Sequence, residues 1–358
     1  MELNLPSLRH EIDRLDNRIL QTLQKRLEIA RLVVKFKREQ NQDVNVPERE
    51  QQILDSLKGR ERSLLSAEVI EEIYRTIFKE SKRLQSESKP LIAFQGEHGA
   101  FSEVAARKWN PELAPIPCLD INDVFHGVEV GSFEYGIVPI ENTVGGMLSQ
   151  INACLMASRL FIVGAIEMSV EHALLIKPGT DYYKLRRVYS QAVALTECHS
   201  FVKRMNLEPV PYYDTAGAAK MLAEKTEEDS AAIASELAAK YYNLEILKTG
   251  IADSKNTRTR FLILARNPLE NGGNRCSIIF TMPNTPGSLF RVMEMFSKEN
   301  INLTRITSIP TEQGNYAFFL DFAASADEER VKDILNQISC EADSYRYLGC
   351  YAEVNQLN

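Results

Sequence analysis

The sequence predicts a multidomain protein in which an all-α segment is followed by an α/β segment and then by a smaller α+β segment. Three observations support this organisation. Residues 7–40 carry apolar side chains at helical spacings, short apolar runs alternate with helices from Leu91 onward, and the chain after residue 275 has the element order βαββαβ. A chain of 358 residues is also longer than one hydrophobic core usually organises.

The first segment is predicted to contain three helices, at 7–40, 47–58 and 66–86. In the first helix, apolar residues from Leu8 to Val34 recur every three or four positions, and Ser7 supplies an N-cap. This helix should be roughly 50 Å long, whereas a globule of about 90 residues has a radius of gyration near 12 Å. It should therefore overhang its own domain, and the simplest cover for its apolar stripe is a second copy. We expect a homo-oligomer, at least a dimer.

The middle segment reads as helices packed on largely parallel sheets. An apolar run from Tyr135 to Ile140 stops at Glu141, Asn142 and Thr143 before two glycines, and a helical stretch is expected from Met147 to Ser158. Such strand–turn–helix junctions bind small anions, because unpaired helix N–H groups point outward there. The candidate strands are 91–95, 135–140, 161–166, 172–177, 186–190, 230–234 and 260–265.

The last segment reads as a ferredoxin-like unit of regulatory size. Its predicted elements are strands at 276–282, 301–308, 315–323 and 345–353 with helices at 287–299 and 327–338. Polar linkers at 86–90 and 267–274 separate the segments, so the predicted domains are 1–88, 91–267 and 275–358.

Composition narrows the class of protein. The net charge of −7 argues against a general nucleic-acid binder, and no apolar run is long enough to cross a membrane. The six cysteines form no C-x-x-C pair, and the first residues show no secretory signal, so we expect a cytoplasmic protein. No metal-ligand cluster or cofactor motif is apparent, and we expect neither a metal nor a cofactor.

Three motifs carry a resemblance to prephenate dehydratase. They are GIVPIENTVGG at 136–146, IAFQGEHGAFSEVAAR at 92–107 and NTRTRFLIL at 256–264. The chain around them resembles the bifunctional chorismate mutase–prephenate dehydratases of phenylalanine synthesis. This resemblance implies a helical mutase domain, a two-lobed dehydratase domain similar to periplasmic binding proteins, and a C-terminal ACT regulatory domain.

In the first segment the resemblance implies a chorismate site. Lys37 and Gln85 would donate to the ether oxygen of chorismate, and arginines would grip its carboxylates, with Arg9 reaching in from the partner chain. The remaining substrate-binding residues would be Arg26, Arg49, Glu50 and Ser81.

In the middle segment Thr259 would assist departure of the prephenate hydroxyl, and Glu141 and Asn142 would complete the catalytic set. The pocket would also include Ser102, Thr143, Ser169 and Arg260, next to Gly99, Phe101 and His172. Arg260 could instead pair within the fold, and a single His in an apolar strand is more often structural. The family's Ser-His-Pro-Gln stretch is here Ser190-Gln191-Ala192-Val193, and a Gln of the family is Glu197. Arogenate is therefore a rival substrate, and a ligand-sensing domain without turnover is a further alternative.

In the last segment Gly287, Ser288 and Leu289 would contact phenylalanine at an interface between two ACT domains. Thr307-Ser308-Ile309-Pro310 replaces the family's Glu-Ser-Arg-Pro, and a dimerisation module without ligand is the alternative. If the segment only regulates, deleting 275–358 should leave catalysis intact and abolish inhibition.

Overall fold

The computed structural model divides the chain into two compact units, Met1–Lys89 and Pro90–Asn358. Each unit is described by itself. The structure describes residues 5–39, 47–59, 64–87, 89–143, 146–147, 149–224, 229–254, 257–269, 273–283, 285–310, 316–325 and 328–356. Residue 88 of the first predicted linker and residues 270–272 of the second lie outside the described residues.

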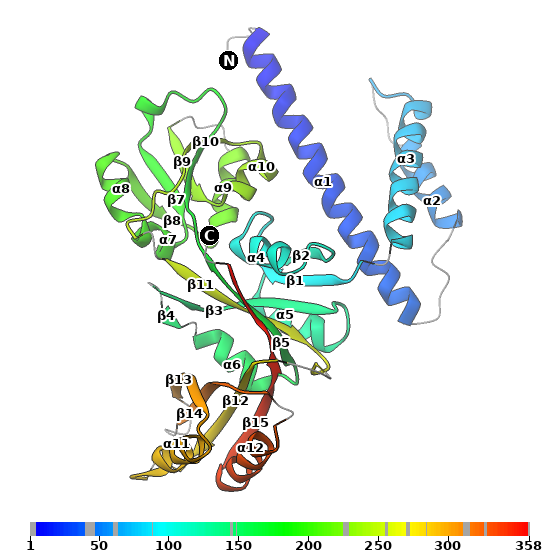
Figure 1. Cartoon of the computed structure of the whole chain (residues 1–358). Coiled ribbons are helices and arrows are strands. Elements are labelled where there is room, and N and C mark those ends of the chain that lie inside the picture. The colour runs from blue at the N-terminus through cyan, green and yellow to red at the C-terminus, as the bar shows by residue number, and fades with distance from the viewer. Residues whose placement is uncertain are drawn as a thin grey trace. The chain divides into compact units, whose positions relative to one another are not determined.

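The described residues of the first unit form three helices, as predicted: α1 (Leu5–Glu39), α2 (Pro47–Lys58) and α3 (Ala67–Ser86). The N-cap of α3 is Ser66, whose side chain accepts a hydrogen bond from the backbone N–H of Val69. Helix α1 runs for 35 residues (Figure 1), which corresponds to about 50 Å.

Much of the apolar stripe on α1 is exposed. The side chains concerned retain between 45% and 65% of their surface: Leu5, Leu8, Ile12, Leu15, Ile19, Leu20, Ile29 and Val33. Within α1, Val34 is buried. Exposure of this many large apolar side chains along one helix is typical of an interaction surface.

The second unit begins with a mixed sheet whose strand order is β16-β5-β11-β3-β1-β2, with β4 paired to β3. We call this sheet, with the helices on it, the first lobe (Figure 1). Its elements are β1 (Leu91–Gln95), α4 (Phe101–Trp109), β2 (Ala114–Cys118), α5 (Ile121–Glu129), β3 (Tyr135–Asn142), β4 (Gly146–Met147), α6 (Ser149–Ala157), β5 (Phe161–Ser169), β11 (Arg258–Ala265) and β16 (Glu353–Gln356).

The second lobe is built on a sheet of order β10-β6-β9-β7-β8. Its elements are β6 (Ala173–Ile176), the short helix η1 (Tyr182–Lys184), β7 (Arg187–Ser190), α7 (Ala192–Glu197), α8 (His199–Arg204), β8 (Glu208–Pro211), α9 (Thr215–Glu224), β9 (Ser230–Ala234), α10 (Glu236–Tyr242) and β10 (Glu245–Lys248).

The chain leaves the first lobe after β5 and returns to it as β11. Strand β11 runs antiparallel between β3 and β5, while β1 pairs in parallel with β2 and β3. In the second lobe β7 is parallel to both neighbours, whereas β6 is antiparallel to both of its own. The prediction of largely parallel sheets was therefore wrong, because a strand that returns from the second lobe enters the first sheet in the opposite direction.

One apolar core spans both lobes. It contains Phe94 and Ile137 of the first sheet together with Leu175 and Ala232 of the second, and it is rich in alanine where helices α9 and α10 pack. Alternate residues of the second sheet, such as Leu174 and Ile233, face a separate core on the other side. The two lobes are thus joined by a packed interior.

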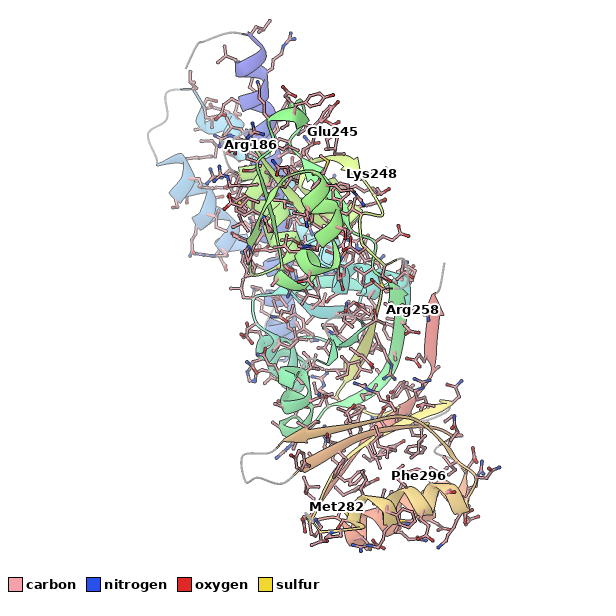
Figure 2. The ribbon with its side chains drawn as sticks, turned by 90° about the vertical axis from the view of Figure 1, so that its left-hand side faces the viewer. Arg186, Glu245, Lys248, Arg258, Met282 and Phe296 are labelled. Carbon is pink, nitrogen blue, oxygen red and sulfur yellow. The ribbon has the colours of Figure 1, made fainter. Side chains whose placement is uncertain are left out.

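The segment that resembles an ACT domain, called the ACT domain below, has a sheet of order β13-β14-β12-β15 and two helices among its described residues. Its elements are β12 (Arg275–Met282), α11 (Ser288–Lys298), β13 (Asn302–Pro310), β14 (Tyr316–Ala323), α12 (Glu329–Glu341) and β15 (Ser344–Tyr351). Figure 2 shows Met282 and Phe296 at this end of the second unit, with Arg258 on the first lobe and Arg186, Glu245 and Lys248 on the second lobe; Met282 and Phe296 share one apolar core.

The predicted final strand, 345–353, is in fact two strands. Strand β15 ends at Tyr351, and β16 pairs in parallel with β5 of the first lobe. Strand β15 also passes close to β5: a Cβ added to Gly349 would lie 2.4 Å from the backbone oxygen of Ile162. The C-terminus of the chain therefore completes the first-lobe sheet, and this argues against the expectation that deleting 275–358 leaves catalysis intact.

Candidate active sites

In the first unit, α1 and α3 bring two of the predicted chorismate-binding residues together. Arg26 Nη1 donates to Ser81 Oγ at 3.0 Å, and the guanidinium carbon lies 5.4 Å from the centroid of the Phe78 ring. Ser81 is buried, and its hydroxyl donates to the carbonyl of Ile77. The Arg26 guanidinium is thus oriented by an aromatic face and a hydroxyl, an arrangement that suits a carboxylate.

The other mutase candidates lie on the same three helices. Glu50, on α2, pairs with Lys82 of α3 at 2.9 Å, and Gln85 Nε2 donates to the carbonyl of Ala30 at 3.3 Å. Arg49 Nη1 donates to Gln52 Oε1 at 3.3 Å, a contact within α2. Arg9 is exposed on the first part of α1 and Lys37 is half-buried near its end.

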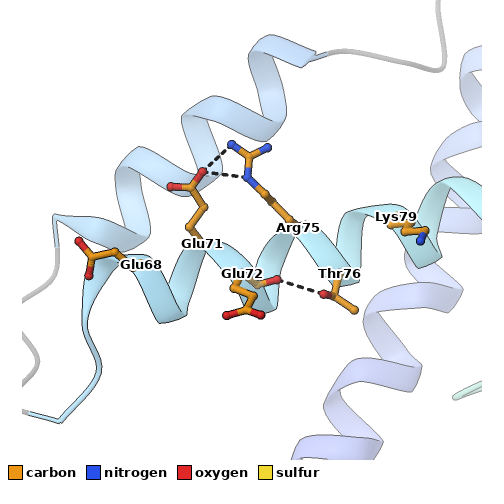
Figure 3. A pocket seen from close by; sticks show the side chains of 6 residues that line it. All are labelled: Glu68, Glu71, Glu72, Arg75, Thr76 and Lys79. Carbon is orange, nitrogen blue, oxygen red and sulfur yellow. Dashed lines mark hydrogen bonds and ion pairs between the residues drawn. The ribbon is translucent and has the colours of Figure 1, made fainter.

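Two hollows of this unit have none of those candidate residues in their lining. A groove of about 740 Å³ is lined by Leu15, Arg18, Ile19, Thr22 and Leu23 of α1 and by Glu72, Ile73, Tyr74, Thr76 and Ile77 of α3. Figure 3 shows a second hollow on α3, where Glu71 accepts hydrogen bonds from Arg75 at 2.5 and 2.8 Å and Thr76 donates to the carbonyl of Glu72. Such i,i+4 pairs are common on the exposed face of a helix. We therefore assign no catalytic or binding role to this second hollow.

In the first lobe, β3 and β11 bring Asn142 and Thr259 together. The two residues are register partners, and Asn142 Nδ2 donates to Thr259 Oγ1 at 3.0 Å. Thr259 is buried, and its other register partner, Met168 on β5, is buried as well. Thr143 exchanges hydrogen bonds with the backbone of Arg258, and Ser169 is the β5 partner of Arg258.

Glu141 and Arg260 lie on the opposite face of the same strands. They too are register partners, and neighbouring residues of a strand point to opposite faces of the sheet. Arg260 donates to Asp321 Oδ2 at 2.6 Å, to Glu353 Oε1 at 2.5 Å and to the Tyr351 hydroxyl at 3.1 Å. The structure therefore favours pairing of Arg260 within the fold over substrate binding.

Glu141 is likewise turned toward the ACT domain. Its Oε2 lies 3.4 Å from Arg305 Nε on β13. Burial opposes the charge of Arg260, but Asp321, Tyr351 and Glu353 more than offset this, so its pKa is raised. Of the residues predicted on these two strands, Asn142 and Thr259 form one pair, and Glu141 and Arg260 form another that faces away from it.

The glycine loop before α4 is shaped by close contact with the second lobe. Gly99 has a φ of +89°, and a Cβ there would lie 2.4 Å from the Cα of Ala238. The Gly99 carbonyl accepts from Ser235 Oγ at 2.5 Å, while its N–H donates to Glu103 Oε2 at 2.8 Å. Glu103 is fully buried. Ser102, predicted to line the pocket, is buried beside it at the start of α4.

A buried pair where the chain enters the second lobe was missed by sequence reasoning. His172 Nε2 lies 2.5 Å from Glu197 Oε2, and the His172 ring meets that of Phe101 edge-on at 5.2 Å between centroids. His172 Nδ1 and Glu197 Oε1 are buried and have no hydrogen-bond partner in the described part of the chain. The sequence signal was the acid at 197, where relatives were expected to carry an amide.

The predicted effector residues lie at the start of α11. Gly287 is its N-cap with a φ of +85°, and a Cβ added there would meet no atom within 4 Å. Ser288 is buried and shares a 2.7 Å hydrogen bond with Thr285, and Leu289 is half-buried. The open space beside Gly287 leaves room for a ligand's carboxylate at the start of this helix.

Among the described residues, no group of three or more His, Cys, Asp or Glu side chains could hold a metal ion. None of the described helices is long and apolar enough to cross a membrane.

The fold and these sites define a multidomain enzyme with a helical catalytic domain, a two-lobed catalytic domain and an ACT domain. Family models match in the same order: chorismate mutase type II over residues 8–86, prephenate dehydratase over 92–269 and the ACT domain over 277–340. The chain belongs to the bifunctional chorismate mutase/prephenate dehydratases, since it is 34% identical to the enzyme of that name from Aquifex aeolicus over 97% of both chains.

Two further comparisons cover the second unit. The chain is 37% identical to an arogenate dehydratase/prephenate dehydratase of Arabidopsis thaliana, over 74% of this chain and 73% of that protein. The solved structure of prephenate dehydratase from Arthrobacter aurescens in complex with L-Phe matches with a TM-score of 0.68 and 28% identity, over 73% of this chain and 89% of that one.

Proposed function

We propose that this chain catalyses two consecutive reactions of phenylalanine biosynthesis. The helical domain rearranges chorismate to prephenate, and the two-lobed domain converts prephenate to phenylpyruvate with loss of water and carbon dioxide. Identity of 34% over nearly the full length to a named bifunctional enzyme carries this proposal. The ACT domain fits feedback inhibition by phenylalanine, because the related dehydratase of Arthrobacter aurescens was solved with L-Phe.

The mutase site needs no nucleophile, because the rearrangement of chorismate is pericyclic and only requires positioning and charge stabilisation. We assign Arg26, oriented by Ser81 and Phe78, to a substrate carboxylate. Lys37 and Gln85 are assigned to the ether oxygen, where negative charge grows in the transition state. An acceleration of about a millionfold requires roughly 8 kcal/mol.

The remaining mutase assignments concern binding. Arg49 and Glu50 on α2 are assigned to the carboxylate and hydroxyl groups of chorismate. Arg9 is assigned to a site completed by a second chain, which the exposed stripe of α1 supports. The oligomer is at least a dimer in this proposal.

In the dehydratase site Thr259 is proposed to assist departure of the hydroxyl by donating a hydrogen bond to it, while the proton of the released water comes from solvent. Because Asn142 Nδ2 already donates to Thr259 Oγ1, the hydroxyl hydrogen of Thr259 is directed elsewhere and is available to the substrate. A proton at the leaving oxygen is what this step needs, since hydroxide is a poor leaving group. Thr143, Ser169 and Ser102 are assigned to the surrounding wall.

The test is to supply the purified protein with chorismate and to resolve prephenate and phenylpyruvate over time, with and without phenylalanine. Both products, with phenylpyruvate suppressed by phenylalanine, are the expected result. Accumulation of prephenate without phenylpyruvate would contradict the dehydratase assignment and leave a ligand-sensing domain in its place.

Arogenate is a second candidate substrate of the two-lobed domain. It carries an ammonium group where prephenate carries a ketone, and the buried carboxylate of Glu197 beside His172 is an observation that favours a cation nearby. Rates measured side by side on prephenate and arogenate decide between them. A kcat/KM at least tenfold higher on arogenate would reassign the second reaction.

A further inference from the structure

Four charged residues join the dehydratase sheet to the ACT sheet. Glu141 and Arg260 are register partners on β3 and β11, and Arg305 and Asp321 are register partners on β13 and β14. Across the junction, Arg260 Nη1 lies 2.6 Å from Asp321 Oδ2, and Arg305 Nε lies 3.4 Å from Glu141 Oε2. We call these four residues the charge quartet. With two cations and two anions it is electrically balanced.

The two arginines of the quartet differ in how they are held. Each guanidinium nitrogen of Arg260 donates a hydrogen bond, to Asp321 and Tyr351 of the ACT domain and to Glu353 of β16. Arg305 is only 10% exposed, and none of its three guanidinium nitrogens has a hydrogen-bond partner among the described residues. It contacts Asp321 at 3.9 Å and lies over the Phe319 ring at 5.0 Å.

This arrangement does not favour stability. Burial lowers the pKa of the Arg305 guanidinium, and the attraction of Asp321 and Glu141 does not fully restore it. A buried cation without hydrogen bonds is costly, because it loses water without regaining equivalent partners. Such a group in a folded protein needs a reason other than stability.

The position of Glu141 supplies that reason. Glu141 precedes Asn142 in β3, and Arg260 follows Thr259 in β11, so the quartet is one peptide away from each member of the catalytic pair. Asn142 Nδ2 donates a 3.0 Å hydrogen bond to Thr259 Oγ1. A small displacement of either strand end changes that bond, and misplacement by about 1 Å can cost a factor of 10² in rate.

We propose that Arg305 is a positioning residue of the dehydratase: from the ACT domain it holds Glu141, and so keeps Asn142 in hydrogen-bonding register with Thr259. This inference rests on the proposed dehydratase function of the Asn142–Thr259 pair. It gives the ACT domain a contact with the active site inside one chain, through the strand that follows α11. A change at α11 that moves β13 changes this contact directly.

The test is a double-mutant cycle with Arg305→Met, Glu141→Gln and the double variant, measured as kcat and KM on prephenate. Arg305→Met should lower kcat 10- to 100-fold with KM changed less than threefold. In the Arg305→Met background, Glu141→Gln should lower kcat by less than a further threefold, because the two residues act as one unit. Additive effects, or an unchanged kcat, would overturn the proposal.

Controls exist within the same chain. The mutase rate of each preparation should stay within twofold of the wild type, which verifies concentration and folding of the first unit. Arg346→Met removes another partly buried arginine at the junction, one that donates to the carbonyls of Leu155 and Leu160. Its kcat should stay within threefold of the wild type. Arg305→Lys should recover part of the rate that Arg305→Met loses.

Hydrogen exchange gives a readout that needs no turnover. Peptides covering 137–143 and 258–262 should exchange at least threefold faster in Arg305→Met than in the wild type or in Arg346→Met. If the wild type fails to convert prephenate, the proposed function falls, while faster exchange in these peptides still supports the positioning contact. Unchanged exchange would refute the contact whatever the substrate is.

Discussion

Gly99→Ala tests the close contact between the two lobes. An added Cβ would lie 2.4 Å from the Cα of Ala238 and 2.7 Å from its Cβ and N, and the backbone φ of +89° disfavours any side chain. The left-handed backbone costs about 1–2 kcal/mol, and overpacking against a backbone that cannot move away costs about 1–3 kcal/mol more. We expect Gly99→Ala to lower the free energy of unfolding of the second unit by about 2–5 kcal/mol.

Gly179→Ala is the matched control for this prediction. Gly179 also has a positive φ, of +78°, but an added Cβ there meets nothing within 4 Å. Gly179→Ala should therefore lower the free energy of unfolding only by the cost of the left-handed backbone, about 1–2 kcal/mol. For a domain of this size 1 kcal/mol corresponds to about 2–4 °C in Tm, so calorimetry resolves the difference. An equal decrease in Tm for the two variants would contradict the predicted overpacking at Gly99, because the lobes would then have moved apart without a measurable free-energy cost.

The remaining predictions separate the two activities and their supports. Thr259→Ala should lower phenylpyruvate formation by about 10²–10⁴ while the mutase rate is retained; equal loss of both rates would indicate misfolding. Gln85→Ala should lower the mutase kcat by about 10²–10³ and spare the dehydratase, as a coupled assay on chorismate and prephenate would show. Ile19→Glu, which places a charge on the exposed stripe of α1, should shift the protein toward monomers in sedimentation and reduce mutase activity with them. Truncation after Tyr351 should lower dehydratase stability by about 3–5 kcal/mol, because it removes β16 and leaves Arg260 without Glu353; unchanged urea unfolding would count against this.

The sequence predicted the long helices and the buried strands well, and the edge strands poorly. Periodicity identified α1 because its apolar residues recur over 35 positions. Strands β2 and β8 contain two prolines each and lie at sheet edges, where a missing N–H is tolerated, so their sequences do not look like strands.

Sequence alone could not show which of the site residues on β3 and β11 lie together, because this depends on what packs against each face of the sheet. Alternation along β3 and β11 implies that Glu141 and Asn142 point to opposite faces, as do Thr259 and Arg260. Which face carries Arg260 is set by its contacts with Asp321 of the ACT domain and Glu353 of β16, 61 and 93 residues away from Arg260 in sequence. A motif read along the chain places all these residues in one pocket, whereas the folded sheet separates them.

The position of β16 in the first-lobe sheet also determines the order in which the domains can fold during synthesis. Domains generally fold as units during synthesis, starting from the N-terminus, so the three-helix unit can form while most of the chain is still being translated. The first-lobe sheet is completed only later, because its edge beside β5 is covered by residues 353–356, which are synthesised after every other strand of that sheet. Until then β5 exposes an unpaired edge, the kind of surface on which nascent chains aggregate. Ribosomes that stop early should therefore release a chain with a finished mutase and an unprotected dehydratase, a product for chaperones or proteases to remove.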